Sequence, residues 1–294
     1  MKKIAIIGAG NVGKVLGYAL MKKGYRITGV VCRSEDSGRK AARLFASPVY
    51  SRPEMAAREA EIIFLTTPDR IIEDVCKLIA DKGGFRKGQI VLHTSGVHSS
   101  NILSSARREG AYGLSFHPLQ TFPSLEEGLN SLPGTYFAVE GDEECFPLAK
   151  DIVNTLQGKL FFIPAEMKEL YHAAACIACN YLVSLMDVAL QCFTAIGIPA
   201  ETAFKALSPL IFSTLHNIRE IGPEKALTGP INRGDLSTIH AHLAKMEALL
   251  PELIPVYKQM GLYTAELAVR KGTLTKAEEK EVKTLLQGGI SSGR

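Results

Sequence analysis

Polar side chains with acid, base or hydrogen-bonding chemistry follow three apolar runs in the first half of the chain. These run ends are Thr66-Thr67-Pro68, His93-Thr94-Ser95-Gly96 and Ser115-Phe116-His117-Pro118-Leu119-Gln120. Ligands of an open α/β sheet bind outside the carboxyl ends of its strands, so we expect these residues to line one crevice. His117 is the candidate for proton transfer, unless it packs beneath a ligand. We expect Ser95 to orient the substrate, with Gly96 and Gln120 contacting it, although a plain turn with a helix N-cap would explain Ser95 and Gly96 equally well.

A helical pattern in the second half carries a further polar stripe. Lys168, His172 and Asn180 fall on one side of an otherwise apolar helix, together with Cys176 and Cys179. A partly desolvated lysine has a lowered pKa and can donate a proton, so Lys168 and His172 are candidate catalytic residues and Asn180 a candidate for orientation. The alternative is a cation at a domain rim beside a core histidine. The two cysteines have the spacing of a metal or redox pair, but no second pair accompanies them, so we expect small core residues and no metal site.

The segment LTGPINRGD, residues 227 to 235, places a cation and a carboxylate between two helical patterns. An exposed arginine in a glycine-containing loop can clamp a carboxylate, so Arg233 and Asp235 are candidate substrate-binding residues and the substrate is expected to be anionic. A turn followed by Asp235 as a helix N-cap is the alternative.

The segment Gly8-Ala9-Gly10-Asn11-Val12-Gly13 follows the first apolar run and opens a helical pattern. In such a motif the first glycine permits a tight turn, the second lets a pyrophosphate approach the backbone, and the third lets the helix pack on the strand. Its position at the start of a long alternating pattern indicates a dinucleotide site that includes Asn11 and Val12.

The tip of the second apolar run selects the form of the dinucleotide. An Asp or Glu is typical there in NAD-binding domains, whereas this run ends at Cys32, Arg33 and Ser34. A cation and a hydroxyl suit a 2′-phosphate, so the sequence favours NADP(H), although Glu35 or Asp36 could still serve a ribose. We expect the third run end, Thr66 to Pro68, to contact the same cofactor.

The elements that must position these residues divide the chain into two domains. Residues 1–164 alternate apolar runs with helical patterns, which predicts a doubly wound Rossmann domain whose parallel sheet has helices on both faces. Residues 165–294 contain only helical patterns, at 165 to 196, 199 to 221, about 235 to 250, 251 to 271 and near 275 to 287. We expect an all-α substrate and dimerisation domain, with the active crevice at the junction of the two domains.

Composition restricts the class of protein. The chain has 294 residues, of which 46% are hydrophobic, and its net charge of +4 shows no basic stripe, so nucleic acid is not an expected partner. The apolar stretch from 173 to 196 contains Asn180, Ser184, Asp187 and Gln191, so we expect no membrane span. We expect a cytoplasmic enzyme with reduced cysteines. The helix over 165–196 is too apolar to have a solvated face, which predicts a homodimer.

Three motifs together indicate a family. With HPLQTF, KELYHAAACIACNYL and TGPINRGD, the chain resembles Rossmann-like oxidoreductases that carry a C-terminal domain of unknown function, DUF2520. More distantly it is similar to pyrroline-carboxylate reductases, ketopantoate reductases, prephenate dehydrogenases and β-hydroxyacid dehydrogenases. The resemblance implies the fold and a nicotinamide cofactor. In the β-hydroxyacid enzymes an Asn follows the site lysine by four residues, whereas here His172 stands at that place, so their mechanism does not transfer directly.

These observations favour an NADP-dependent oxidoreductase that moves a hydride between nicotinamide and a small carbonyl, imine or hydroxy-acid substrate. Two other functions stay open at this point. One is a non-catalytic dimer that senses NADP(H), and the other is an oxidoreductase acting between NADP and a deazaflavin coenzyme.

Overall fold

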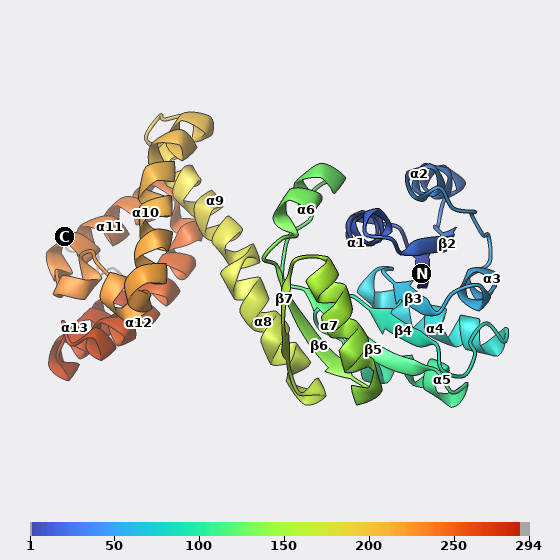
Figure 1. The fold of residues 1–294 in the computed structure, drawn as a ribbon. Coiled ribbons are helices and arrows are strands. Elements are labelled where there is room, and N and C mark those ends of the chain that lie inside the picture. The colour runs from blue at the N-terminus through green and yellow to red at the C-terminus, as the bar shows by residue number, and fades with distance from the viewer. Residues whose placement is uncertain (1, 289–294) are drawn as a thin grey trace. The chain divides into compact units, whose positions relative to one another are not determined.

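The structure, a computed structural model, describes residues 2–288. The chain forms two compact units that divide between Ala178 and Cys179. The strands and the helices that cover them lie in the first unit, and the second unit is helical (Figure 1). The predicted fold class, a Rossmann domain followed by an all-α domain, is confirmed.

Seven strands form one sheet in the order β2-β1-β3-β4-β5-β6-β7. Their bounds are β1 Lys3–Ile7, β2 Arg26–Val31, β3 Ile62–Leu65, β4 Ile90–His93, β5 Tyr112–Pro118, β6 Tyr136–Gly141 and β7 Lys159–Phe162. The first five are parallel and are continuous apolar runs, because a strand covered on both faces has no solvated side. The strand order reverses between β1 and β3, the place where open α/β sheets bind their ligands.

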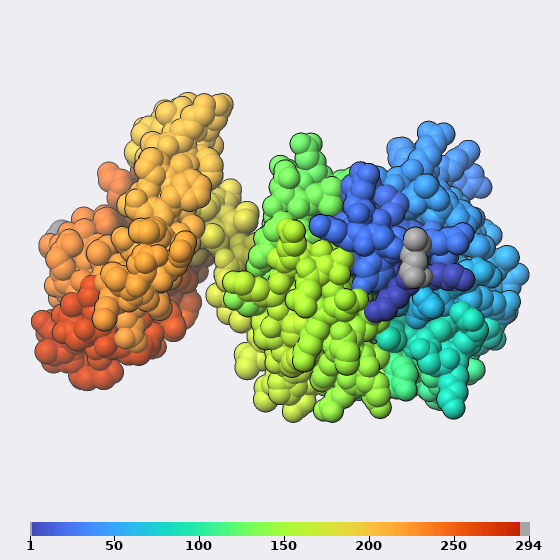
Figure 2. Space-filling view, in the orientation of Figure 1, coloured from blue at the N-terminus to red at the C-terminus, as the bar shows by residue number. Residues whose placement is uncertain are grey.

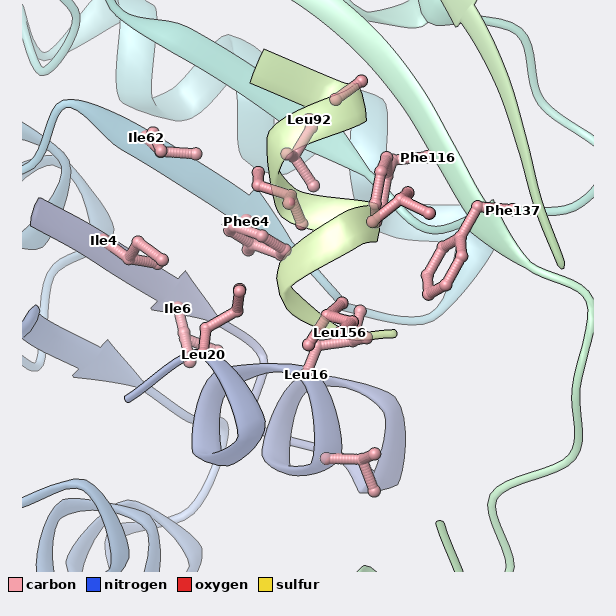
Figure 3. Close-up of a cluster of buried hydrophobic side chains, with 14 of the residues drawn as sticks. Ile4, Ile6, Leu16, Leu20, Ile62, Phe64, Leu92, Phe116, Phe137 and Leu156 are labelled. Carbon is pink, nitrogen blue, oxygen red and sulfur yellow. The ribbon is translucent and has the colours of Figure 1, made fainter. Parts of the chain in front are cut away.

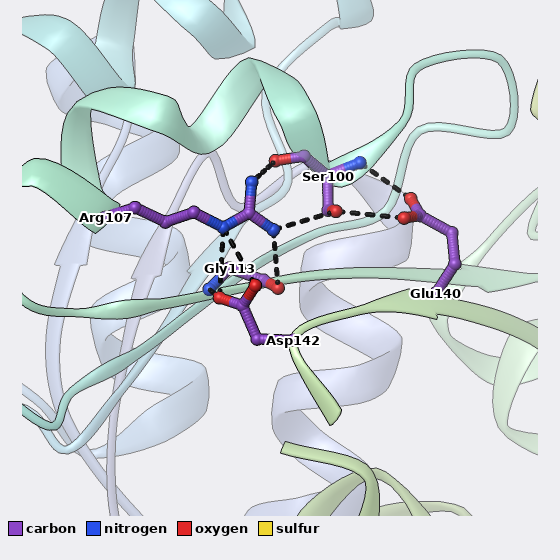
Figure 4. Close-up of polar contacts among 5 residues, drawn as sticks. All are labelled: Ser100, Arg107, Gly113, Glu140 and Asp142. Carbon is purple, nitrogen blue, oxygen red and sulfur yellow. Dashed lines mark hydrogen bonds and ion pairs between the residues drawn. The ribbon is translucent and has the colours of Figure 1, made fainter. Parts of the chain in front are cut away.

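The sheet is not wholly parallel, which corrects the prediction. Strand β6 runs antiparallel to β5, with Pro118 opposite Phe137, and β7 is parallel to β6. A cluster of polar residues connects the end of β6 to the start of β5 (Figure 4). Asp142 accepts hydrogen bonds from the Arg107 Nε at 3.0 Å and from the Gly113 amide at 2.6 Å. The end of β6 is thereby held to the start of β5.

Alternate side chains of each strand build two cores, one on each face of the sheet. Ile4, Ile6, Ile62 and Phe64 belong to the first core, which α1, α2, α6 and α7 cover (Figures 1 and 3). Their neighbours Ala5, Ile7, Ile63 and Leu65 belong to the second core, beneath α3, α4 and α5. The helix bounds are α1 Asn11–Lys22, α2 Glu35–Phe45, α3 Pro53–Arg58, α4 Ile72–Asp81, α5 Ser104–Arg108, α6 Leu125–Ser131 and α7 Phe146–Thr155.

The helical pattern that begins at residue 165 forms two helices rather than one. After a short turn of 3₁₀ helix, α8 spans Lys168–Ala178 and α9 spans Asn180–Ala195, and Cys179 between them departs from ideal helical geometry. Helix α8 belongs to the first unit because Lys168 is buried there and the Tyr171 ring lies 6.0 Å from the Phe161 ring of β7. The last strand ends at Phe162, whereas the compact units divide between Ala178 and Cys179, 14 residues after the predicted boundary at residue 164.

The second unit consists of α9, α10 (Ala200–Ala226), α11 (Leu236–Leu249), α12 (Ile254–Lys271) and α13 (Lys276–Gln287), close to the predicted ranges. Gly222, with φ +79°, interrupts α10 near the predicted helix end. A small core forms where α11, α12 and α13 meet; its fully buried members are Ile239, Leu243, Ala265, Ala268, Val282 and Leu286. Helix α9 contributes no buried residue, and α10 contributes only Ala203.

Residues 165–195 form a helical stretch that is long and apolar enough to cross a membrane, by length and composition alone. The prediction of no membrane span rested on polar residues that all lie on α9: Asn180, Ser184, Asp187 and Gln191. Among them, Gln191 donates a hydrogen bond to Asp187 at 2.7 Å. The first part of the stretch, α8, packs on the sheet of the first unit.

Candidate active site

The carboxyl ends of five neighbouring strands present the predicted site residues in spatial order. Across the sheet, β2 ends before Arg33, β1 before Gly8, β3 before Thr66, β4 before Thr94 and β5 at His117 and Pro118. Adjacent strands lie roughly 4.8 Å apart, so about 14 Å separate the tip of β2 from that of β4. An extended ligand can therefore run from Arg33 past the glycine loop toward Thr94.

The glycine loop has the geometry that its motif predicts. Gly8 has φ +96°, and a Cβ there would lie 2.7 Å from the Thr67 amide nitrogen. A Cβ on Gly13 would lie 2.5 Å from the Thr66 Oγ1, so this glycine lets α1 approach the sheet. A Cβ on Gly10 would meet nothing within 4 Å, which leaves the backbone open to a ligand. A long helix thus begins at a loop with room for a phosphate group.

A cavity of about 650 Å³ lies over this loop. Its walls include predicted cofactor residues, among them Gly8, Gly10, Val12, Arg33, Ser34, Thr66, Thr67 and Pro68, and it extends to Thr94. Arg33 is exposed at its rim. Glu35 and Asp36 do not line it; they pair with Arg39 and Lys40 one turn along α2. Glu35 and Asp36, the acidic residues that could bind a ribose, thus form ion pairs within α2, whereas Arg33 lines the cavity.

Two threonines at the end of β3 have different tasks. The Thr66 hydroxyl donates a hydrogen bond to the Gly8 carbonyl oxygen at 2.6 Å and so fixes the loop. The Thr67 Oγ1 is buried and has no partner among the described residues. A buried hydroxyl without a partner is costly, so this atom is a candidate ligand contact.

Asn11 and Ser34 are occupied by local structure. The Asn11 side-chain amide donates to the carbonyl oxygens of Phe122 and Pro123, at 2.9 and 3.0 Å, and Asn11 does not line the cavity. Ser34 is the N-cap of α2, where its hydroxyl accepts from the Ser37 amide. Asn11 therefore supports the loop after β5, while Ser34 both caps its helix and lines the cavity.

Ser95 and His93 form a hydrogen-bonded turn after β4. The Ser95 hydroxyl accepts from the His98 amide at 3.1 Å, and the Ser95 amide donates to the His93 Nδ1 at 3.2 Å. Burial, followed by the nearby charge of Lys168, lowers the pKa of His93 to about 3. His93 is therefore neutral, with the proton on Nε2 directed to the Ser99 carbonyl oxygen. The turn that was the alternative for Ser95 is present, and the Ser95 side chain is buried within it.

Lys168 lies inside the protein rather than in an open crevice, which corrects the predicted placement. Its side chain is fully buried, and its ammonium donates to the Ser95 carbonyl oxygen at 2.9 Å and to the Ser115 Oγ at 2.8 Å. Burial lowers the pKa of this ammonium to about 8. The lysine thus joins α8 to the ends of β4 and β5, directly beneath the turn at Ser95 and Gly96.

A buried carboxylate lies near this ammonium. Glu140 is 3% exposed and stands opposite Ser115 in the β5–β6 pair, so the two side chains share a face of the sheet. Its oxygens accept from the Ser100 amide at 2.6 Å and from the Ser100 hydroxyl at 2.9 Å (Figure 4). The negative charge of Glu140 opposes the effect of burial and keeps the pKa of Lys168 from falling further.

His117 is held by a tyrosine from α8. Its Nδ1 lies 2.7 Å from the Tyr171 hydroxyl, and the two rings meet edge to face. Burial, and then the charges of Lys168 and His172, lower the pKa of His117 to about 3, so the ring is neutral near pH 7. Burial also raises the pKa of Tyr171 to about 12, which keeps its hydroxyl protonated.

His172 and His117 meet above Gly96. A Cβ on Gly96 would lie 2.4 Å from the His172 Nδ1 and 2.9 Å from the His117 Nε2. The His172 Nδ1 is buried without a partner, and its Nε2 lies 3.6 Å from the Cys176 Sγ. Cys176 is partly exposed and Cys179 is exposed, so neither is the core residue that was predicted. Within residues 2–288, no group of three or more His, Cys, Asp and Glu side chains is placed to hold a metal ion.

The remaining predicted substrate contacts have local partners or lie in the second unit. Gln120 is exposed and accepts from the Thr121 amide. Asp235 is the N-cap of α11 and accepts from Thr238 and from the Ser237 hydroxyl, so the N-cap alternative is present. Arg233 and Asn180 are exposed within the second unit. Their contact with a substrate stays a prediction.

Several residues at the site were missed from the sequence. Tyr171 lies three residues after Lys168, on the same helix face, but an aromatic residue there resembled core. Glu140 is a carboxylate at the end of the apolar run YFAVE, and a buried carboxylate requires partners, which was a usable signal. The cavity lining also includes Cys32, Ser37, Asp69, Arg70 and Thr94.

Two family models match the chain. A Rossmann-like domain matches residues 1–118, and the domain of unknown function DUF2520 matches residues 135–264. The chain therefore carries the two domains that its motifs indicate. No curated protein matches the chain.

Solved structures of similar fold cover most of the chain. A Bacteroides fragilis protein, provisionally described as an NADP oxidoreductase, is 25% identical with a TM-score of 0.72, over 90% of this chain and 98% of that one. A Thermotoga maritima protein is 26% identical with a TM-score of 0.70, over 92% and 99%. Pyrroline carboxylate reductase of Plasmodium falciparum, with NADP bound, shares the fold at 13% identity and a TM-score of 0.59, over 97% and 98%.

Proposed function

We propose that the protein is an NADP-dependent oxidoreductase that transfers a hydride between nicotinamide and a small carbonyl, imine or hydroxy-acid substrate. The observation that carries the proposal is the cavity that runs from Arg33 across the glycine loop to Thr94, next to the turn where His117 and His172 meet. The similarity to the Bacteroides fragilis protein supports an oxidoreductase of this kind.

The residues of the cavity fit a dinucleotide with a 2′-phosphate. Gly10 leaves room for a pyrophosphate at the start of α1, and the unpartnered Thr67 hydroxyl can reach a ligand in the cavity. Arg33 offers a guanidinium at the cavity rim, while the nearby carboxylates of Glu35 and Asp36 are paired on α2. When bound, the nicotinamide supplies or accepts the hydride, and the protein positions the substrate.

The side chains near Gly96 have distinct tasks in this proposal. His117 and His172 contact the substrate: His117 donates a hydrogen bond to it, and His172 exchanges the proton with it, since an imidazole can act as a general acid or base. Lys168 holds the Ser95 carbonyl oxygen and the Ser115 hydroxyl, so it fixes the turn and supplies a positive charge beneath the substrate rather than donating the proton itself. Ser95 orients the turn through the His98 amide.

The test is a screen of small keto acids, hydroxy acids and cyclic imines with NADPH or NADP, in which the change in nicotinamide absorbance is followed. We expect turnover with one class. Gly8→Val is the control, because its Cβ would lie 2.7 Å from the Thr67 amide nitrogen and so distort the loop that is proposed to bind the dinucleotide. Tight binding of NADPH without turnover of any class would contradict the proposal in favour of a sensor. Turnover only with a deazaflavin coenzyme would contradict it in favour of the other alternative.

We further propose that the protein works in the cytoplasm as a homodimer whose interface includes α9 and α10. Large apolar side chains on these helices are exposed, among them Val183 at 68%, Leu210 at 64% and Phe212 at 68%, and the α10 surface is in plain sight in Figure 2. The core of the second unit leaves this surface uncovered. A patch of this kind is typical of a subunit interface, and Asp187 and Gln191 on α9 disfavour contact with lipid.

Light scattering at micromolar concentration tests the dimer. We expect a mass near 64 kDa, twice the 31.9 kDa of one chain, in buffer without detergent. Phe212→Glu should shift the mass toward 31.9 kDa, because it places a charge among apolar side chains. A mass of one chain for the unmodified protein would refute the dimer, and a requirement for detergent would favour a membrane partner.

A further inference from the structure

The imidazoles of His117 and His172 each have a ring nitrogen with no hydrogen-bond partner among residues 2–288, and these two nitrogens lie close together. The His117 Nε2 and the His172 Nδ1 lie 2.9 and 2.4 Å from one point, the Cβ position of Gly96, so the distance between the two nitrogens is at most the sum of these values, about 5.3 Å. One oxygen at hydrogen-bond lengths of about 2.8 Å can bridge nitrogens up to about 5.6 Å apart. A single ligand atom can therefore satisfy both rings.

The contact of Tyr171 sets which proton His117 carries. If the Tyr171 hydroxyl donates to Nδ1, both groups are satisfied and only the Nε2–H of His117 lacks a partner. If the His117 Nδ1–H donates to the Tyr171 hydroxyl instead, two groups lack a hydrogen-bond partner: the Tyr171 hydroxyl proton and the His117 Nε2 lone pair. No second contact to this hydroxyl exists among the described residues. The first arrangement leaves fewer groups unpaired, so His117 presents an N–H above Gly96.

We infer that His117 and His172 form a paired-imidazole site for one oxygen of the substrate, that Tyr171 positions His117, and that the substrate is a carbonyl compound or its alcohol rather than an imine. The inference rests on the proposed function and narrows its substrate class. A carbonyl oxygen has two lone pairs and can accept from both rings. The alcohol oxygen accepts from the His117 Nε2–H while its own O–H donates to the His172 Nδ1.

A neutral imine fits the pair less well. Its nitrogen has one lone pair and no hydrogen, so it satisfies only one of the two rings; when that ring is His117, the buried Nδ1 of His172 is left unpaired. Leaving such a group unpaired corresponds to a preference of roughly 10- to 100-fold for the oxygen compound. His172 is partly exposed, so its ring is not enclosed on every side by the protein.

Proton balance between the two substrate forms is simple. With the carbonyl compound, His172 is a cation with one N–H on Nδ1 and the other on Nε2, which faces the Cys176 Sγ. Transfer of the Nδ1 proton to the oxygen leaves His172 neutral, with its remaining proton on Nε2 and a free lone pair on Nδ1. With the alcohol, the transferred proton is on the substrate oxygen. His172 therefore exchanges one proton with the oxygen, while His117 donates a hydrogen bond to it in both forms.

The first experiment needs neither cofactor nor substrate. Nitrogen NMR of ¹⁵N-histidine-labelled protein, with His117 assigned from the spectrum of His117→Ala, should show His117 neutral at pH 7 with its proton on Nε2. In Tyr171→Phe the Nδ1 resonance should move to that of a nitrogen without a hydrogen bond. Tyr136→Phe, which changes an exposed tyrosine of the same unit, should leave it in place. A proton on Nδ1 in the unmodified protein would overturn the inference about Tyr171.

The second experiment compares substrates. A keto acid and a cyclic imine carboxylate with the same number of carbons are offered with NADPH, and we expect at least about 10-fold higher kcat/KM for the keto acid. Tyr171→Phe should lower kcat about 10-fold with NADPH affinity unchanged, whereas a purely structural role would weaken both. An equal or higher rate with the imine would overturn the substrate class. If neither compound is consumed, the proposed function fails instead, and the NMR result still decides the role of Tyr171.

Discussion

Replacement of Lys168 by Met should change how the stability of the protein depends on pH. The folded protein binds the Lys168 proton more weakly than the unfolded chain, because burial lowers its pKa from the ordinary value of 10.5 to about 8. Between these values the unfolded chain holds more protons, so the free energy of unfolding rises with pH. Below about pH 8 both states are protonated, and the full cost of the buried charge is present.

The magnitude follows from the two pKa values. They differ by about 2.5, which at 1.36 kcal/mol for each pKa unit is about 3 kcal/mol. The unmodified protein should gain about this much stability, relative to Lys168→Met, as the pH rises from 8 to 10.5. The variant also leaves the Ser95 carbonyl oxygen and the Ser115 hydroxyl without the ammonium, but that loss does not depend on pH and shifts the comparison by a constant.

Urea unfolding at several pH values from 7 to 10.5 measures this difference. Far-ultraviolet circular dichroism is the suitable signal, since the chain contains no tryptophan. Lys23→Met, at an exposed lysine, is the control and should follow the unmodified protein at every pH. If the difference between the unmodified protein and Lys168→Met is the same at all pH values, then the ammonium is hydrated in the folded state and the argument from burial is wrong.

Three other changes test separate parts of the site. Arg33→Glu should weaken the binding of NADPH at least about 10-fold and leave the binding of NADH nearly unchanged, because it removes the cation proposed to face the 2′-phosphate. Fluorescence titration measures both affinities, and equal affinities for NADPH and NADH in the unmodified protein would contradict NADP preference. Thr67→Val should leave the stability of the protein equal or slightly higher, since the buried Thr67 hydroxyl has no partner among the described residues. It should weaken the binding of the dinucleotide about 5- to 10-fold, and an unchanged affinity would show that the hydroxyl does not contact the dinucleotide. Glu140→Gln should cost about 1–3 kcal/mol in urea unfolding, because the two Ser100 groups donate to different carboxylate oxygens and an amide has only one acceptor oxygen. The exposed Glu144→Gln is its control, and equal stabilities would refute the role of Glu140.

The alternating pattern was sufficient to predict the fold but not the direction of every strand. A run such as GTYFAVEG is apolar whichever way it pairs, so its residues do not reveal that β6 is antiparallel to β5. The antiparallel direction of β6 occurs together with contacts between residues that are distant in the sequence, such as those of Asp142 with Arg107 and with the Gly113 amide. Periodicity reports burial, and strand direction depends on tertiary partners that periodicity does not contain.

The nucleotide end of the site was more predictable than the substrate end for a similar reason. The geometry of the glycine loop is set within a short segment, so a local motif contains the information. Lys168 and His172 could be placed on one helix face, but the depth of Lys168 depends on acceptors at Ser95 and Ser115, which lie 73 and 53 residues away. The break at Cys179, which separates Asn180 from this face, has no clear residue signal.

Lys168 and Tyr171 together influence which protons His117 carries. This influence gives a reason for burying Lys168, although its burial destabilises the fold. The Lys168 charge adds to burial in keeping the His117 ring neutral, and the Tyr171 hydroxyl occupies its Nδ1. A charged imidazole would have N–H groups on both nitrogens, one of them facing the Tyr171 hydroxyl, which would then need another acceptor for its own proton. With the ring neutral and Nδ1 occupied, the remaining N–H lies above Gly96, beside the unpartnered Nδ1 of His172. With the proposed function, the cost of about 3 kcal/mol at neutral pH is consistent with a role in catalysis, because the buried cation that destabilises the fold adds to burial in keeping His117 neutral, with one N–H for the proposed hydrogen bond to the substrate.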